Sequence, residues 1–207
     1  MNRDQQLGFD ALLQTADADN EARLRNSKYG HLPETLDEAA PYLQNLIERH
    51  HAAMLAADGD LVAQLRADAH DLAEKLNGYE AGILANDDAP GRVLDRLTAA
   101  SRGMAPLWGQ SGSFEVVYGK MRVAVEMDGL FGIGARFMVW PGFAAHALDW
   151  DKPFLSETGY RSFLGVGGAL EPGLTPCGFA ERMIAAYVKK ALKGKLVLIE
   201  QRYRQSP

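Results

Sequence analysis

The stretch FEVVYGKMRVAVEM, residues 114–127, decides the fold of the second half of the chain. Hydrophobic and polar residues alternate from Met121 to Met127, which is the period of a half-buried β-strand. Gly119-Lys120 separates this run from the preceding one. It suits a two-residue type II′ turn, because glycine tolerates the positive φ of the first turn position. The stretch therefore predicts an antiparallel hairpin.

The same signals continue downstream. Asp128-Gly129 suits a type I′ turn, so strands are expected near 113–118, 121–127 and 130–140. Further strands are expected between 143 and 166 and over 195–204. The segment from Thr175 to Gly194 has a capping threonine, a proline at the first helical position, an apolar stripe and a terminal glycine, which together predict a helix over 176–193. We expect an antiparallel β-meander of about four to six strands covered by this C-terminal helix.

Upstream, the hydrophobic period becomes helical. Apolar residues recur at spacings of three, four and seven over 36–54 and 61–76, as in amphipathic helices. The first main helix is expected to begin near Pro41. The second is expected to take Asp60 as its N-cap and to end at Asn77-Gly78. Their short connection predicts an antiparallel hairpin, and a further short helix is expected over about 90–101.

The order of these elements predicts an α+β protein. Its helical N-terminal region spans 1–105 and its sheet-plus-helix region spans 110–207, either as two domains or as one continuous domain. The 207 residues, 47% hydrophobic and 24% charged, can bury a sizeable core and exclude wholesale disorder. Nothing in the sequence resembles a secretory signal or a membrane span of about 20 apolar residues. With Cys177 as the single cysteine, we expect no disulfide, no cysteine-rich zinc site and a cytoplasmic location.

Charge is distributed unevenly along the chain. Residues 1–110 contain 10 Lys+Arg against 18 Asp+Glu, a net of −8, and residues 111–207 contain 12 against 9, a net of +3. The basic residues near the C-terminus form a candidate nucleic-acid or anion-binding surface, with Tyr203 available for stacking: Lys189, Lys190, Lys193 and Arg202. The simpler interpretation is a solvated helix end whose lysines offset the helix dipole. The overall charge of −5 argues against a dedicated nucleic-acid-binding protein.

The densest polar stretch is HALDWDKPFLSETGYR, residues 146–161. His146 and Asp149 suggest a general-base pair or part of a metal site. Arg161 suits a bidentate anion contact, and Glu157 is an additional acid. Cys177 falls in the first turn of the predicted helix, where the dipole favours a nucleophilic thiolate. The alternative interpretation is a polar turn, a structural salt bridge and a buried cysteine.

Other motifs carry weaker signals. The glycine-rich stretches GLFGIGAR (129–136) and GVGGALEPG (165–173) lack the spacing of a dinucleotide fingerprint or a P-loop. Gly132 and Gly134 are expected on one face of the third strand, where they would admit a neighbouring segment. A metal held by the histidines of the first two helices and Glu74 is an alternative to ordinary, partly exposed histidines. We predict no metal and no cofactor.

No motif identifies a known family, and the sequence leaves open whether the protein is an enzyme. We favour a non-enzymatic binding or interaction protein with a protein or small-molecule partner, because no catalytic constellation has a recognised spacing. One alternative is a small hydrolase or transferase that uses the five candidates of 146–177. The other is a nucleic-acid-associated protein that uses the basic C-terminal surface. No membrane partner is expected, and the oligomeric state stays open.

Overall fold

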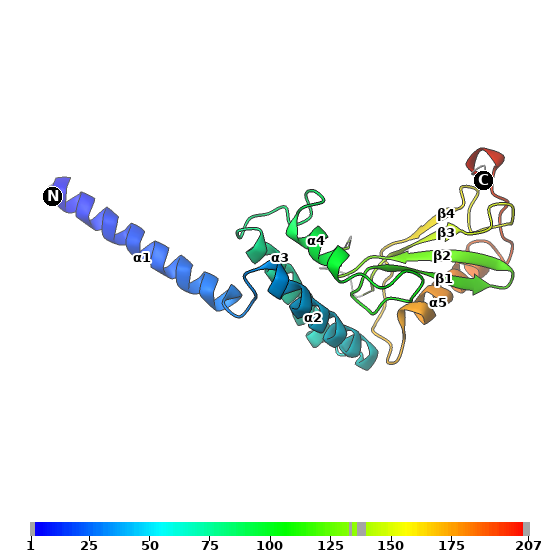
Figure 1. Cartoon of the computed structure of the whole chain (residues 1–207), viewed down its shortest axis with the longest axis horizontal. Coiled ribbons are helices and arrows are strands. Elements are labelled where there is room, and N and C mark those ends of the chain that lie inside the picture. Colours follow the sequence, from blue (N-terminus) through cyan, green and yellow to red (C-terminus); the bar gives the residue numbers. More distant parts are fainter. Residues whose placement is uncertain (1–2, 133, 136–139, 205–207) are drawn as a thin grey trace.

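The computed structural model describes residues 3–132, 134–135 and 140–204 (Figure 1). The fold is α+β, as predicted, with a four-stranded antiparallel sheet at the lower end of the expected strand number. The elements follow one another along the described chain as α1 (Arg3–Tyr29), α2 (Leu36–Ala56), α3 (Gly59–Leu76), α4 (Pro90–Leu97), β1 (Gly112–Tyr118), β2 (Met121–Met127), β3 (Phe143–Ala147), β4 (Tyr160–Phe163), α5 (Pro176–Lys190) and the 3₁₀ turn η1 (Gln201–Tyr203).

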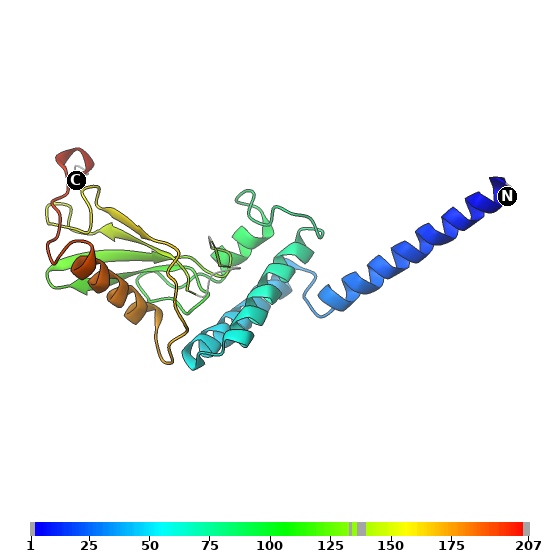
Figure 2. The ribbon, with the colours of Figure 1, turned by 180° about the vertical axis from the view of Figure 1, so that it is seen from behind.

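Helix α1 extends away from the rest of the molecule (Figures 1 and 2). Its side chains from Gln14 to Lys28 are exposed. This part of the helix therefore buries no stripe of hydrophobic residues, and the helical spacing of such residues is the signal from which a helix is predicted. Its last turn is attached to α3, where Lys28 forms an ion pair with Asp71 at 2.8 Å. The Tyr29 hydroxyl also donates to Glu74 at 3.0 Å. Helix α1 is therefore not among the helices predicted from the sequence.

Helices α2 and α3 form the predicted antiparallel hairpin. The first begins at Leu36, so the expected start near Pro41 is wrong. The Thr35 side chain caps α2 by accepting from the Glu38 backbone at 3.4 Å, and Pro41 is accommodated five positions after the start. The cap of α3 is Asp58, not Asp60, because its carboxylate accepts from the Leu61 backbone at 3.1 Å. The helix ends at Asn77-Gly78 as expected, with Gly78 at φ 68°.

The strands are ordered β1-β2-β3-β4, and every neighbouring pair is antiparallel. Gly119 has a φ of 61° between β1 and β2, where Tyr118 pairs with Met121, so the predicted first hairpin is confirmed. The predicted second hairpin is wrong. Met127 pairs with Phe143, and a long connection replaces the turn expected at Asp128-Gly129.

Tertiary contacts explain this difference. After β2 the chain turns toward the helices, where the Leu130 backbone donates to the Gly109 carbonyl at 2.9 Å, and both Leu130 and Phe131 are buried. Gly132 and Gly134 therefore lie in turns and not on a strand face. The rest of the strand expected over 130–140 falls partly on 133 and 136–139, which lie outside the described residues.

Helix α5 covers one face of the sheet (Figure 2). It starts as predicted, with Thr175 accepting from the Gly178 backbone at 3.2 Å and Pro176 at the first helical position. The strand expected over 195–204 is not formed. In its place, Val197 makes an isolated bridge with Phe154, and η1 follows.

Trp108 joins the helical half to the sheet half. Its indole Nε1 donates to the Leu174 carbonyl at 2.8 Å, and its ring packs edge-on against Phe179 of α5 at 5.5 Å. On the other side, its backbone N–H donates to His51 Nδ1 at 3.1 Å, and its carbonyl accepts from His50 Nδ1 at 3.0 Å. One cluster of buried hydrophobic residues includes the helices, Trp108 and the sheet.

Candidate functional site

The face of the sheet that α5 leaves uncovered carries His146 and borders Asp149, two of the five candidates of 146–177. In β2 the alternate residues Met121 to Met127 are buried, whereas Arg122 and Glu126 are exposed on the other side. The register places Glu115, Ala124, His146 and Tyr160 in one row across the four strands. We call this surface the open sheet face and define it by Glu115, Val117, Arg122, Ala124, Glu126, Ala144, His146 and Tyr160.

His146 has neighbours that the sequence analysis did not identify. Its Nε2 lies 3.4 Å from Glu126 Oε2, and its ring centroid lies 5.0 Å from that of Tyr160. The direct cross-strand neighbour of His146 is Ala124, and Glu126 lies two residues further along β2, so its side chain meets His146 diagonally on the same face. The carboxylate in contact with His146 is thus that of Glu126, whereas Asp149 contacts Arg122 and Lys152.

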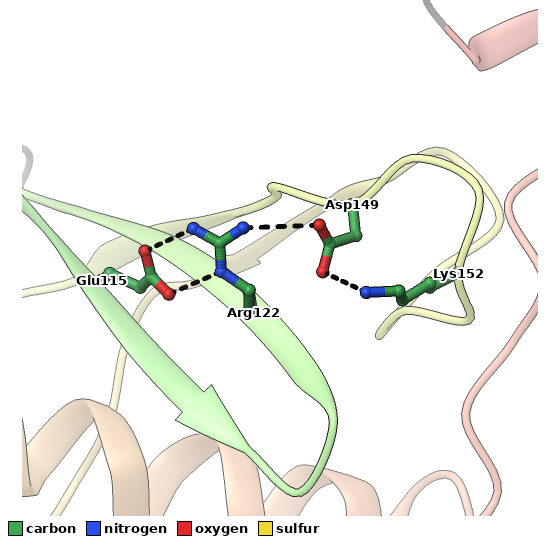
Figure 3. A network of polar contacts seen from close by, with 4 residues as sticks. All are labelled: Glu115, Arg122, Asp149 and Lys152. Atoms are coloured by element: carbon green, nitrogen blue, oxygen red, sulfur yellow. Dashed lines mark hydrogen bonds and ion pairs between the residues drawn. The ribbon is translucent and has the colours of Figure 1, made fainter.

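Asp149 belongs to a separate network at the edge of this face (Figure 3). Arg122 donates to Glu115 through Nε at 2.8 Å and through Nη2 at 2.9 Å, and it reaches Asp149 at 3.5 Å. Lys152 donates to the second oxygen of Asp149 at 2.9 Å. The Lys152 hydrogen bond, aided by Arg122, holds the pKa of Asp149 below its ordinary value. A carboxylate held between two cations is a weak base.

Arg161 and Cys177 lie on the other side of the sheet. Arg161 pairs with Ala145, whose side chain is on the α5 face, and its guanidinium lies 4.4 Å from the ring centroid of Tyr187 in α5. Cys177 is in the first turn of α5 and packs against the core. Because alternate residues of a strand point to opposite faces, the sheet separates His146 from both.

The environment of Cys177 opposes thiolate formation. Burial raises the pKa of the thiol, and the Glu181 carboxylate raises it further by its charge and by accepting a hydrogen bond at 3.5 Å. Both effects act against the positive end of the helix dipole, which favours the thiolate.

We therefore expect Cys177 to react slowly with iodoacetamide at neutral pH, several-fold more slowly than the same thiol in the urea-unfolded chain. Mass spectrometry of timed samples measures the rate. Glu181→Gln should increase the rate in the folded protein, because it removes the neighbouring negative charge. Alkylation of the folded wild type as fast as that of the unfolded chain would contradict this assignment.

Glu157 is exposed in the loop between β3 and β4, where its backbone carbonyl accepts from Glu200 at 2.9 Å. The five candidates of 146–177 thus occupy distinct surroundings. The described residues form a cleft of about 250 Å³ beside Tyr29 and another of about 490 Å³ beside Pro33. None of the five candidate residues lines either cleft.

The basic C-terminal residues are exposed. Lys189 and Lys190 end α5, and Lys193 follows in the helix-terminating turn. Arg202 is different, because its Nε lies 2.6 Å from Glu200 Oε2 and its charge is compensated by this ion pair.

Two histidines of the helical hairpin, His50 and His51, are engaged in hydrogen bonds with Trp108. Arg66 Nε donates to His50 Nε2 at 3.2 Å, so the His50 proton resides on Nδ1 and is donated to the Trp108 carbonyl. Among residues 3–132, 134–135 and 140–204, no group of three or more His, Cys, Asp or Glu side chains is arranged to hold a metal ion. The hairpin histidines and Glu74 are not gathered into such a group in this part of the chain.

Sequence reasoning missed Glu115, Glu126 and Tyr160 as neighbours of the candidate residues. For Glu115 and Glu126, the sequence does contain the information needed to place them. The Gly119-Lys120 turn fixes the β1–β2 register, and the alternation in β2 places Arg122 and Glu126 on the polar face. Tyr160 could not be paired with His146 in advance, because the register of β3 and β4 depends on an irregular loop between them.

Within the described residues, no helix combines the length and apolar character needed to cross a bilayer. No family model matches the chain, and no solved structure matches it. Its sequence is similar to two Escherichia coli proteins, each named Protein KlcB. One is 38% identical over 158 residues, which cover 74% of this chain and 36% of the relative. The other is 42% identical over 115 residues, which cover 55% of this chain and 24% of the relative.

The chain therefore spans about a third or less of the length of these curated relatives. Their name specifies neither a reaction nor a ligand. The similarity shows shared sequence, and the function is inferred from the geometry of the chain.

Proposed function

We propose that this chain is a non-enzymatic binding protein whose open sheet face contacts a protein partner. The observation that carries the proposal is the asymmetry of the sheet. Helix α5 packs on one face, whereas Val117 and Tyr160 on the other face are 60% and 46% exposed. An exposed apolar and aromatic surface framed by charges is typical of interaction sites.

The shape of the open sheet face favours a protein over a small ligand. Its central strands β2 and β3 contribute the small side chains of Ala124 and Ala144 beside His146, and neither described cleft lies on it. Glu115 and Arg122 at its edge are already held in an ion-pair network. A partner docking on the centre would bury the tyrosine and valine and leave this network at the rim, where exposed charges contribute to specificity.

The distribution of the five catalytic candidates supports binding over catalysis. A nucleophile and its base must lie within hydrogen-bond reach, yet His146 and Cys177 are on opposite sides of the sheet. Asp149 is held by Arg122 and Lys152 instead of orienting the imidazole.

The test is recovery of the partner with paired surface variants in cells of the source organism. V117D/Y160A removes the two exposed anchors of the open sheet face. L97D/Y203A is the matched control, because Leu97 and Tyr203 are 59% and 38% exposed on α4 and η1. We expect the affinity-tagged wild type and the control to retain the same partner, and V117D/Y160A to lose at least about 90% of it, as expected for an anchor contribution near 2 kcal/mol.

Equal retention of the partner by both double variants would overturn the proposal. So would turnover of a substrate by the purified chain that His146→Ala abolishes, because that result would place catalysis on this face.

A further inference from the structure

Positive charge is concentrated where α5 ends. Lys189 and Lys190 form the last turn of the helix, and Lys193 and Lys195 follow directly; all four are exposed. We call these four residues the C-terminal lysine surface. This set differs by one residue from the set predicted from the sequence. Arg202 is left out because Glu200 compensates its charge, and Lys195 takes its place.

The charges of this surface are not neutralised locally. Within the described ranges, no carboxylate lies at ion-pair distance from any of the four ammonium groups. The neighbouring Arg182, by contrast, is paired with Glu171. Residues 153–204 contain eight Lys+Arg and four Asp+Glu, a net of +4 in a chain of net −5. The surface is thus a local positive region in an acidic protein.

Compensation of the helix dipole accounts for only part of this charge. Lys189 and Lys190 lie in the last turn, where a cation interacts favourably with the helix dipole. Lys193 and Lys195 lie beyond the helix. Two of the carbonyls in the last turn already accept from the backbone, since Gly194 donates to Val188 at 2.8 Å and Ala191 donates to Tyr187 at 2.9 Å.

Planar groups lie next to these lysines. Arg161 stacks over Tyr187, which is one helical turn before Lys190. Guanidinium planes and aromatic rings are the surfaces on which unpaired nucleic-acid bases stack. Lysines alone attract an anionic membrane only weakly, and the apolar helix face whose insertion would strengthen such binding is occupied by the sheet in α5.

We propose that the C-terminal lysine surface binds the phosphate backbone of single-stranded nucleic acid, with the Arg161–Tyr187 pair beside it for base contacts. This function is separate from protein binding through the open sheet face, because α5 covers the opposite face of the sheet.

The experiment measures fluorescence anisotropy of a labelled oligothymidine of about 20 nucleotides with the full chain across salt concentrations. With four phosphate contacts, log K should fall with log salt at a slope of about −0.7 × 4, a loss on the order of 50-fold between about 50 and 200 mM. Replacing Lys189, Lys190, Lys193 and Lys195 together with glutamine should weaken binding at low salt by at least about tenfold and bring the slope close to zero.

The matched control removes the same charge elsewhere by replacing four exposed basic residues with glutamine: Arg92, Arg96, Arg102 and Lys120. It should keep the wild-type slope. Circular dichroism checks that both variants are folded. The proposal is overturned by absence of binding at low salt, by equal loss in both variants, or by binding to phosphatidylserine vesicles without binding to the oligonucleotide.

Discussion

Trp108→Ala should lower the free energy of unfolding by about 3–5 kcal/mol, the cost of deleting a fully buried aromatic side chain. The indole is 1% exposed and packs against both Trp140 and Phe179, at ring-centroid distances of 5.4 and 5.5 Å. Its removal leaves a cavity at the junction of the two halves and leaves the Leu174 carbonyl without the donor at 2.8 Å. Urea unfolding followed by far-ultraviolet circular dichroism measures the change.

Two further variants make this result specific. Trp108→Phe keeps a ring and removes only the N–H donor and part of the volume, so we expect a smaller loss of about 1–3 kcal/mol. Trp150→Ala removes a half-buried indole that rests on Gly159, and its effect should be less than half that of Trp108→Ala. A Trp108→Ala protein as stable as the wild type would show that the two halves do not depend on this side chain.

The second large effect is a loss of stability in acid caused by His50. Burial lowers the pKa of His50 from 6.5 to about 4, with Arg66 and His51 lowering it further and the Trp108 carbonyl opposing the shift. The unfolded chain therefore takes up a proton at this residue between about pH 6.5 and 4, and the folded chain does not. The contribution of neutral His50 to stability is fully present above pH 6.5 and is lost as the pH falls toward 4. The free energy of unfolding should decrease by about 3 kcal/mol over this range.

Urea unfolding at a series of pH values tests this. His50→Gln keeps a donor and an acceptor for Trp108 and Arg66 but cannot titrate, so the difference in unfolding free energy between wild type and variant should shrink as the pH is lowered from 7 to 4. Nuclear magnetic resonance of the His50 ring in the folded wild type provides an independent measurement. A His50 signal that titrates above about pH 6 would contradict the assignment.

The elements predicted correctly are those with local signals. Thr175 and Pro176 mark the start of α5, and Gly119 marks the first β-turn, because capping and positive φ are decided by a few adjacent residues. The α2–α3 hairpin is predictable because both helices bury a regular stripe.

The wrong or missing predictions concern segments whose conformation is set by contacts between residues far apart in the sequence. Asp128-Gly129 has the sequence of a tight turn, but burial of Leu130 and Phe131 beside Gly109 directs the chain away from β2. Trp108 lies in a connector rich in glycine and small residues, and only the fold reveals that it is central to the core. Helix α1 has no buried stripe over its described side chains, so the period gives no indication of it.

Only part of the candidate site could be predicted, because it too depends on both local and distant contacts. His146, Asp149 and Arg161 are close in sequence, but alternation along the strands assigns His146 and Arg161 to opposite faces of the sheet. The partners of His146 come from β2 and β4, and strand pairing alone brings them together.

The central claim, that the open sheet face binds a protein, is tested most directly by site-specific photo-crosslinking. A photoreactive phenylalanine at Val117 samples this face, and the same residue at Leu97, which is equally exposed, samples α4. After irradiation of cells of the source organism, we expect one discrete crosslinked product from position 117 that is absent from position 97. Crosslinking of the same product from position 97, or none from position 117, would contradict the claim.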